Sequence, residues 1–230
     1  MTNKAEVIAT LDRLIAEVTT KATPDDPWAV IRSDYRARIA EAMTGYLATD
    51  KPSTSFRGAF RTAAIENLPA AFWNGYAETA GEVDYSDSDA GDWIAAKLES
   101  ELGFIGELFV SLKQLRDQFW RGEVDSDGLR DEVKTRVDGY AATLESVRVA
   151  GKMWGAKNQM LEWELGNTEQ HCESKNGRFG CANLDGTAHR AKWYLARDLI
   201  PRKPGAAQVC GGWQCDCKLK NVKTGEYITL

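Results

Sequence analysis

Apolar residues recur every three or four positions through most of the first 165 residues, with polar residues between them. This spacing places the apolar side chains on one face of an α-helix. Such stripes occupy residues 7–18, 28–47 and 129–147, and the last continues toward Leu161 and Leu165. The clearest stripe comprises Leu98, Leu102, Ile105, Leu108, Phe109, Leu112, Leu115 and Phe119.

Short polar breaks separate these segments. Thr23–Pro27 ends the first helix and begins the second, and a third follows Asp50–Thr54. Within the third, Pro69 predicts a bend or a restart. Because most breaks are short, neighbouring helices should run antiparallel. Residues 1–165 are therefore predicted to form an up-and-down bundle of about five or six helices.

An acidic loop lies at Asp84–Asp92, where Asp and Ser alternate. The alternation is similar to a calcium loop, but Gly91 and the missing Glu at the twelfth position depart from the EF-hand spacing. Asp and Ser side chains also cap the first turn of helices. We interpret the segment as a loop that caps the helix following it.

The pattern changes after Gly166, and residues 166–230 are rich in Gly, Cys and Lys. Ala188–Leu199 is the one short helical candidate there. Too few apolar residues remain for an independent core, so a module of this size needs a metal, a disulfide or a neighbouring domain. The predicted fold is mainly α, an antiparallel helical bundle with a small Cys-rich C-terminal knuckle.

All five cysteines and both histidines lie between His171 and Cys217. Thiolates and imidazoles gathered in one segment are typical of zinc sites, and Gly211-Gly212 allows the sharp turn that would point thiolates inward. Buried reduced thiols or a disulfide are the alternatives. The sequence predicts a structural zinc ion held by Cys172, Cys181, Cys210 and Cys215, with Cys217 as the substitute for either of the last two.

The two histidines have separate candidate roles. His171 adjoins Cys172 and can replace it as a ligand. His189 follows Asp185, and together they suggest a second hypothesis, a small zinc-supported nuclease in which His189 is the base. A surface histidine at the start of a helix is the simpler interpretation. No phosphate-binding loop, nucleophile elbow or dinucleotide fingerprint occurs, so we assign no catalytic residue and no small-molecule substrate.

The net charge of −5 is unevenly distributed along the chain. Residues 151–230 hold 12 Lys and Arg against 8 Asp and Glu, so the preceding residues carry the acidic excess. An acidic body does not indicate a dedicated nucleic-acid binder. No apolar run reaches the length of a membrane span, and the first residues lack the apolar region of a secretory leader. These features and the odd cysteine count favour thiol or metal chemistry in the cytoplasm.

The C-terminal motifs resemble a known family. The segments are Trp163-Glu-Leu-Gly-Asn-Thr-Glu-Gln-His-Cys172, Cys181-Ala-Asn-Leu-Asp-Gly186 and Cys210-Gly-Gly-Trp-Gln-Cys-Asp-Cys217-Lys-Leu. They are similar to the C-terminal module of tailed-phage minor head proteins, the Mu F-like head-morphogenesis family. The resemblance covers about residues 135–220. Two departures are the eight residues between the first two cysteines, where members have two, and Cys210, which stands in place of a histidine.

The resemblance implies a virion component made in the cytoplasm of the host bacterium. It implies a place near the portal or inside the capsid, and a part in head assembly, DNA packaging or DNA delivery. The expected partners are portal or capsid proteins and packaged DNA. A third hypothesis is a host-directed adaptor that binds a bacterial protein through the tryptophan-rich helices.

Overall fold

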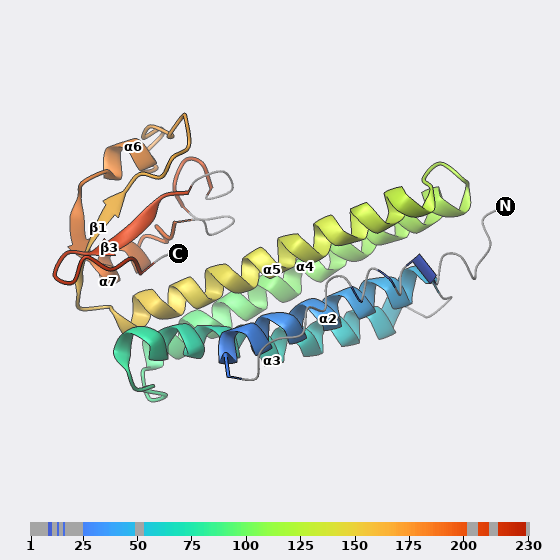
Figure 1. The fold of residues 1–230 in the computed structure, drawn as a ribbon, viewed down its shortest axis with the longest axis horizontal. Helices are drawn as coiled ribbons and strands as arrows, with labels where there is room; N and C mark the ends of the chain where they lie inside the picture. Colours follow the sequence, from blue (N-terminus) through green and yellow to red (C-terminus); the bar gives the residue numbers. More distant parts are fainter. Residues whose placement is uncertain are drawn as a thin grey trace. The chain divides into compact units, whose positions relative to one another are not determined.

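The computed structural model describes residues 9–10, 13, 16, 25–48, 53–201, 207–211 and 216–228. Four long helices pack against each other, and a three-stranded antiparallel sheet follows near the C-terminus (Figure 1). The predicted class, a mainly α bundle with a small C-terminal module, is confirmed. The helix predicted at residues 7–18 lies largely outside the described residues.

The long helices are α2 (Pro27–Ala48), α3 (Ser53–Ala80), α4 (Ser88–Trp120) and α5 (Ser126–Gly155). An aspartate caps three of them by accepting backbone N–H groups of the first turn. Asp26 accepts from Trp28 at 2.9 Å, Asp87 accepts from Ala90 at 3.3 Å, and Asp125 accepts from Gly128 at 2.8 Å. The acidic loop before α4 therefore caps that helix, as its composition predicts.

Helix α3 continues through Pro69, so the predicted restart there is wrong. Proline removes one backbone hydrogen bond and usually kinks a helix. Here Leu68 and Phe72 on either side of it are 1% and 0% exposed. Burial of these large side chains offsets the lost hydrogen bond and keeps the helix intact.

The chain divides into two compact units, residues 1–70 with 91–141 and residues 71–90 with 142–230. The first unit contains α2 and the larger parts of α3, α4 and α5. Tyr46 packs edge-on against Phe109 with ring centroids 5.1 Å apart, and Phe60 packs against Tyr140 at 4.7 Å. Tyr46 and Phe60 are buried, and with the half-buried Phe109 and Tyr140 they form part of the core that the apolar stripes predict.

In the second unit, the end of α3 lies against the end of α5 at small residues. A Cβ atom added at Gly75 would lie 2.0 Å from the carbonyl oxygen of Arg148, and one at Gly151 would lie 2.0 Å from that of Phe72. Glycine at these positions therefore lets the two backbones touch.

The sheet of the second unit has the order β2-β1-β3. Strand β1 (Met160–Glu164) is central, and β2 (Ala188–Arg190) and β3 (Lys218–Asn221) pair with it antiparallel. Trp163 on β1 and Leu219 on β3 are neighbours in register, and both are fully buried. The short helices α6 (Cys181–Leu184) and α7 (Ala191–Leu195) lie in the connection between β1 and β3.

Two predicted helical segments differ from the structure. The last long helix ends at Gly155, and Leu161 lies on strand β1 instead. Burial alternates along β1, which is the period of a strand with one buried face. The helix predicted at Ala188–Leu199 divides into β2 and α7. The predicted boundary after residue 165 stays a prediction, although β1 on its N-terminal side pairs with strands on its C-terminal side.

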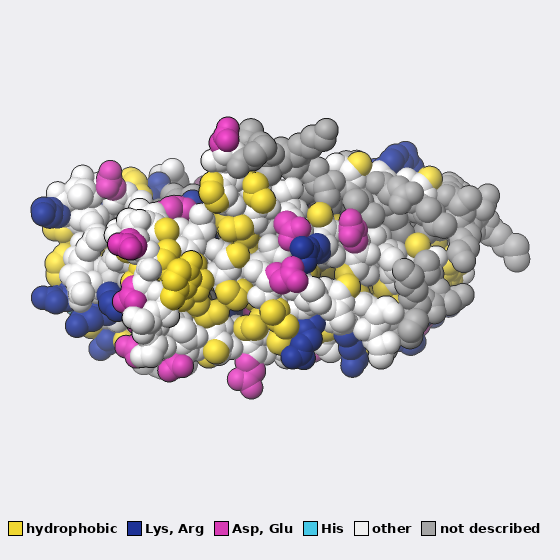
Figure 2. All heavy atoms as spheres, turned by 90° about the horizontal axis from the view of Figure 1, so that it is seen from below, with side chains coloured by type: hydrophobic (Ala, Val, Ile, Leu, Met, Phe, Trp, Pro, Cys, Tyr) yellow, Lys and Arg dark blue, Asp and Glu magenta, His cyan; other side chains and the backbone are white. Residues whose placement is uncertain are grey.

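One face of the molecule mixes hydrophobic and charged side chains. Figure 2 shows one face, where hydrophobic side chains gather in small groups between acidic and basic ones, and no histidine is visible. No helix among the described residues is long and apolar enough to cross a membrane. On this face, no wide area carries side chains of a single charge sign.

We expect Gly151→Ala to destabilise the protein by about 1–3 kcal/mol, because the new methyl group must push the α3 backbone away. Gly139 in the same helix has open space around it. Gly139→Ala should therefore raise stability by about 0.5–1 kcal/mol through helix propensity alone. Urea denaturation of both variants measures the difference. Equal effects of the two substitutions would contradict a backbone contact at Gly151.

Candidate metal centre

Three cysteines that are distant in sequence meet in the second unit. The sulfur atoms of Cys172, Cys181 and Cys210 all lie within 4.8 Å of one another. The sulfurs of Cys181 and Cys210 are 3.7 Å apart. Four thiolates around a zinc ion at 2.3 Å form a tetrahedron whose edge is about 3.8 Å. The spacing of this pair is therefore the spacing of two ligands on one ion.

A folded loop brings Cys172 back to Cys181. At its tip, Asn176 and Gly177 both have positive φ, 53° and 75°, as in the tight turn of a two-residue hairpin. At its base, a Cβ added to Gly180 would lie 2.2 Å from the backbone of Glu173. Only glycine fits between the two sides of the loop, and the N–H of Cys181 then lies 3.3 Å from the Cys172 sulfur.

Cys210 reaches the other two cysteines from a later segment. The N–H of Val209 donates to the carbonyl of Phe179 at 2.9 Å. The guanidinium of Arg178 donates to the carbonyl of Gln208 at 2.6 Å. These two bonds join the loop before Cys181 to the residues before Cys210, so the thiols converge through backbone contacts on both sides.

The surroundings of Cys172 favour its thiolate. Burial raises the pKa of this thiol, but the N–H groups and thiols of Cys181 and Cys210 hydrogen-bond its sulfur and lower the pKa by more. The net result is a pKa below the ordinary value for cysteine. Because metals bind the thiolate, this shift favours coordination.

Cys217, the predicted substitute ligand, lies outside the group of three. Its fully buried sulfur is 3.7 Å from Nδ1 of His171, and Nε2 of that ring is 3.3 Å from the carbonyl oxygen of Gly166. With the Nε2 proton donated to Gly166, Nδ1 faces the thiol as an acceptor. Cys215 lies outside the described residues, so its predicted part in the site stays a prediction.

Asp216 fixes the segment that carries Cys217 and leads into β3. Its carboxylate accepts the hydroxyl of Thr168 at 2.5 Å and the N–H groups of Asn167 and Thr168 at 2.6 and 3.2 Å. These hydrogen bonds lower the pKa of Asp216 to about 2. The Thr168 hydroxyl contributes most, and the Asn167 N–H contributes next. Hydrogen bonds to the charged form have this effect. We call these contacts of Asp216 with Asn167 and Thr168 the Asp216 clamp. Sequence analysis did not predict it, because the partners lie far from Asp216 along the chain.

The two residues of the nuclease hypothesis lie in different surroundings. Asp185 accepts the N–H of Leu165 at 3.2 Å. The ring of His189 stacks on Trp193, with centroids 3.8 Å apart and planes at 15°. No hydrogen bond joins His189 to a carboxylate in the described part of the chain. The base and the carboxylate that orients it are therefore not assembled there.

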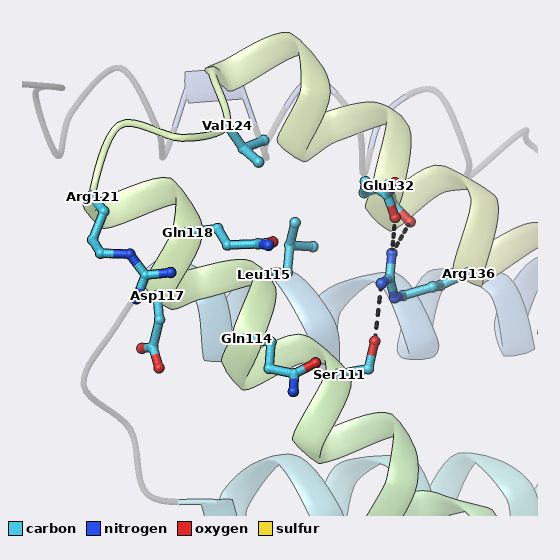
Figure 3. A pocket seen from close by; sticks show the side chains of 9 residues that line it. All are labelled: Ser111, Gln114, Leu115, Asp117, Gln118, Arg121, Val124, Glu132 and Arg136. Atoms are coloured by element: carbon cyan, nitrogen blue, oxygen red, sulfur yellow. Dashed lines mark hydrogen bonds and ion pairs between the residues drawn. The ribbon is translucent and has the colours of Figure 1, made fainter.

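A separate polar pocket lies between α4 and α5 in the first unit, with a volume of about 560 Å³. Figure 3 shows Arg136 of α5 joined to Glu132 of the same helix and to Ser111 of α4, near Gln114 and Gln118. The bond to Ser111 is 3.0 Å long. Because the Arg136 charge already has a carboxylate partner, we assign no ligand to this pocket.

Comparison of the chain with protein-family models, curated proteins and solved structures finds no match. The candidate site therefore stands on its own geometry, and the phage resemblance of the C-terminal motifs is a hypothesis.

We expect Asp216→Ala to raise the labelling rate of Cys217 by a soluble alkylating reagent several-fold, because residues 167–168, which Asp216 holds, would no longer be anchored. Peptide mass spectrometry after timed labelling gives the rate at each cysteine. Glu169→Ala is the matched control, since Glu169 is exposed, carries a carboxylate and adjoins Thr168. An unchanged rate at Cys217 in Asp216→Ala would mean that the Asp216 clamp does not protect this thiol.

Proposed function

We propose that Cys172, Cys181 and Cys210 hold a structural zinc ion, and that the chain is a minor head component of a tailed-phage virion. The observation that carries the zinc proposal is the meeting of three thiols from two loops at ligand spacing. Thiolates select soft or borderline metals, and a tetrahedral set of sulfur ligands is characteristic of structural zinc.

The fourth ligand completes a closed site. Cys215 is the candidate that the sequence provides, since Cys217 faces His171 outside the three-thiol group. Four protein ligands leave no open position for a water molecule or a substrate, so the ion would stabilise the fold and would not catalyse a reaction.

The C-terminal module needs such a cross-link. Its sheet has short strands of five, three and four residues, and long irregular segments connect them. The segments that hold the cysteines bury little apolar surface of their own. Apparent zinc binding energies of roughly 10–16 kcal/mol in small modules would dominate the stability of these segments.

The virion proposal rests on the resemblance of the three C-terminal motifs to the minor head family. Two observations are compatible with it. The described residues contain no assembled catalytic group at His189 and Asp185, and the second unit carries a small sheet with a candidate metal centre. The proposed partners are portal or capsid proteins, and packaged DNA is a further candidate.

We expect one zinc ion per chain in protein purified under reducing conditions, and loss of that ion in Cys172→Ser or Cys181→Ser. Cys217→Ser is the matched control and should keep the metal, because Cys217 lies with His171 outside the three-thiol group. Elemental mass spectrometry gives the metal content, and thiol titration before and after chelation counts the released ligands. Full metal content in Cys181→Ser would overturn the proposed site.

We expect the chain to co-purify with phage particles released from the bacterium that carries its gene. Quantitative mass spectrometry of density-banded particles gives its copy number relative to the major capsid protein. A fixed stoichiometry that survives high-salt washing supports the virion role. Recovery only with host proteins, and none in particles, would instead support the host-directed adaptor.

A further inference from the structure

Trp193 on α7 lies between the imidazole ring of His189 and the guanidinium group of Arg197. The ring of His189 stacks on it with centroids 3.8 Å apart, and the guanidinium carbon of Arg197 lies 4.2 Å from its centroid. A ring stacked this closely leaves no room for the guanidinium on the same face, so the two groups cover opposite faces. Such a stack of imidazole, indole and guanidinium is held by dispersion and by cation–π attraction.

A fourth flat side chain extends this group beside the metal centre. Phe179 meets Trp193 edge-on, with centroids 5.7 Å apart. Phe179 lies two residues before Cys181, and its carbonyl accepts the N–H of Val209, next to Cys210. We call Phe179, His189, Trp193 and Arg197 the aromatic stack. It is assembled from the loop before Cys181, strand β2, and helix α7 with the residues that follow it.

The segment around the stack is strongly basic. Residues 175–203 contain seven Lys and Arg against two Asp and Glu, although the whole chain has a net charge of −5. Lys175, Arg190 and Lys192 are exposed. None of these three forms an ion pair within the described ranges. Unpaired cations on a net acidic protein indicate a local surface for a polyanion.

We infer that the aromatic stack and its flanking cations form a binding surface for a nucleic-acid strand with accessible bases. Arg190 and Lys192 would contact phosphates, and the exposed outer face of the Arg197 guanidinium would accept a stacked base. Proteins that hold single strands combine cations along the backbone with planar groups under the bases. An acidic protein surface would bind the cations but would not need flat side chains for stacking. The aromatic stack therefore favours a nucleic acid as the ligand.

This inference is independent of the virion role, because it concerns the isolated chain. Fluorescence anisotropy with a labelled 20-nucleotide oligothymidine, and with a duplex of the same length, measures the binding over a series of salt concentrations. We expect the single strand to bind more tightly than the duplex. Arg190→Glu combined with Lys192→Glu should weaken binding at least tenfold and reduce the salt slope by about 1.4, which corresponds to two lost phosphate contacts.

The matched control is Arg61→Glu combined with Lys134→Glu, which makes the same charge change at exposed positions of the helical bundle. Its affinity for the oligonucleotide should fall far less. Arg197→Lys keeps the charge but removes the plane, so we expect a loss of about fivefold or more for the single strand and little change for the duplex. Zinc content and circular dichroism equal to those of the parent chain establish that each variant is folded.

Three results would overturn the inference. One is equal weakening by the two double variants, which would mean a non-specific charge effect. Another is an affinity for the duplex that equals or exceeds the affinity for the single strand, since binding would then not depend on a base that stacks on Arg197. The third is displacement of the oligonucleotide by polyglutamate at the same charge concentration, which would identify an acidic protein as the partner. Particle co-purification has no bearing on any of these outcomes.

Discussion

Three sulfur atoms within 4.8 Å of one another set the constraint on which the C-terminal module depends. They join a loop that leaves β1 to a segment that returns toward β3. Close thiolates repel one another unless a cation or protons lie between them, so the three sulfurs can meet either as hydrogen-bonded thiols or around a metal ion. The same convergence positions Phe179, which is one member of the aromatic stack.

Strand β1 links this module to the helices that precede it. Its buried Trp163 packs near Tyr194 of α7, with ring centroids 6.1 Å apart, and the Tyr194 hydroxyl donates to the carbonyl of Thr187 at 2.9 Å. A strand in the centre of a small sheet has both edges occupied, so every hydrogen-bonding position of β1 serves one neighbour or the other. The sheet is small, but its central strand is well anchored.

The sequence allowed the helical part to be predicted because helix signals are local. Apolar stripes and Asp caps act over a few residues, and they located α2, α4 and most of α5. The strand at Leu161 and Trp163 was missed because apolar residues at alternate positions can also continue a helical stripe over one turn. The restart predicted at Pro69 was wrong because the burial of Leu68 and Phe72 depends on tertiary packing, which no local rule contains.

The candidate site was only partly predictable for the same reason. A cluster of cysteines indicates metal chemistry from composition alone, but which thiols meet depends on how the loops fold. The separation of Cys217 from the other three follows from the contacts of Asp216 and His171 with residues some fifty positions away. Sequence spacing also suggested that His189 belonged with Asp185, whereas the fold placed it against Trp193.

The glycines between α3 and α5 have a consequence for how the two helices can move. Gly75 lies against the backbone of Arg148, Gly151 lies against the backbone of Phe72, and Gly155 lies against the backbone of Tyr76. If one helix moved along its axis by one residue, a Cβ atom would take the place of a glycine and clash with the facing backbone. The two helices can therefore not slide along one another in small steps without a steric clash. An insertion in either helix near these glycines would shift all three close backbone contacts together.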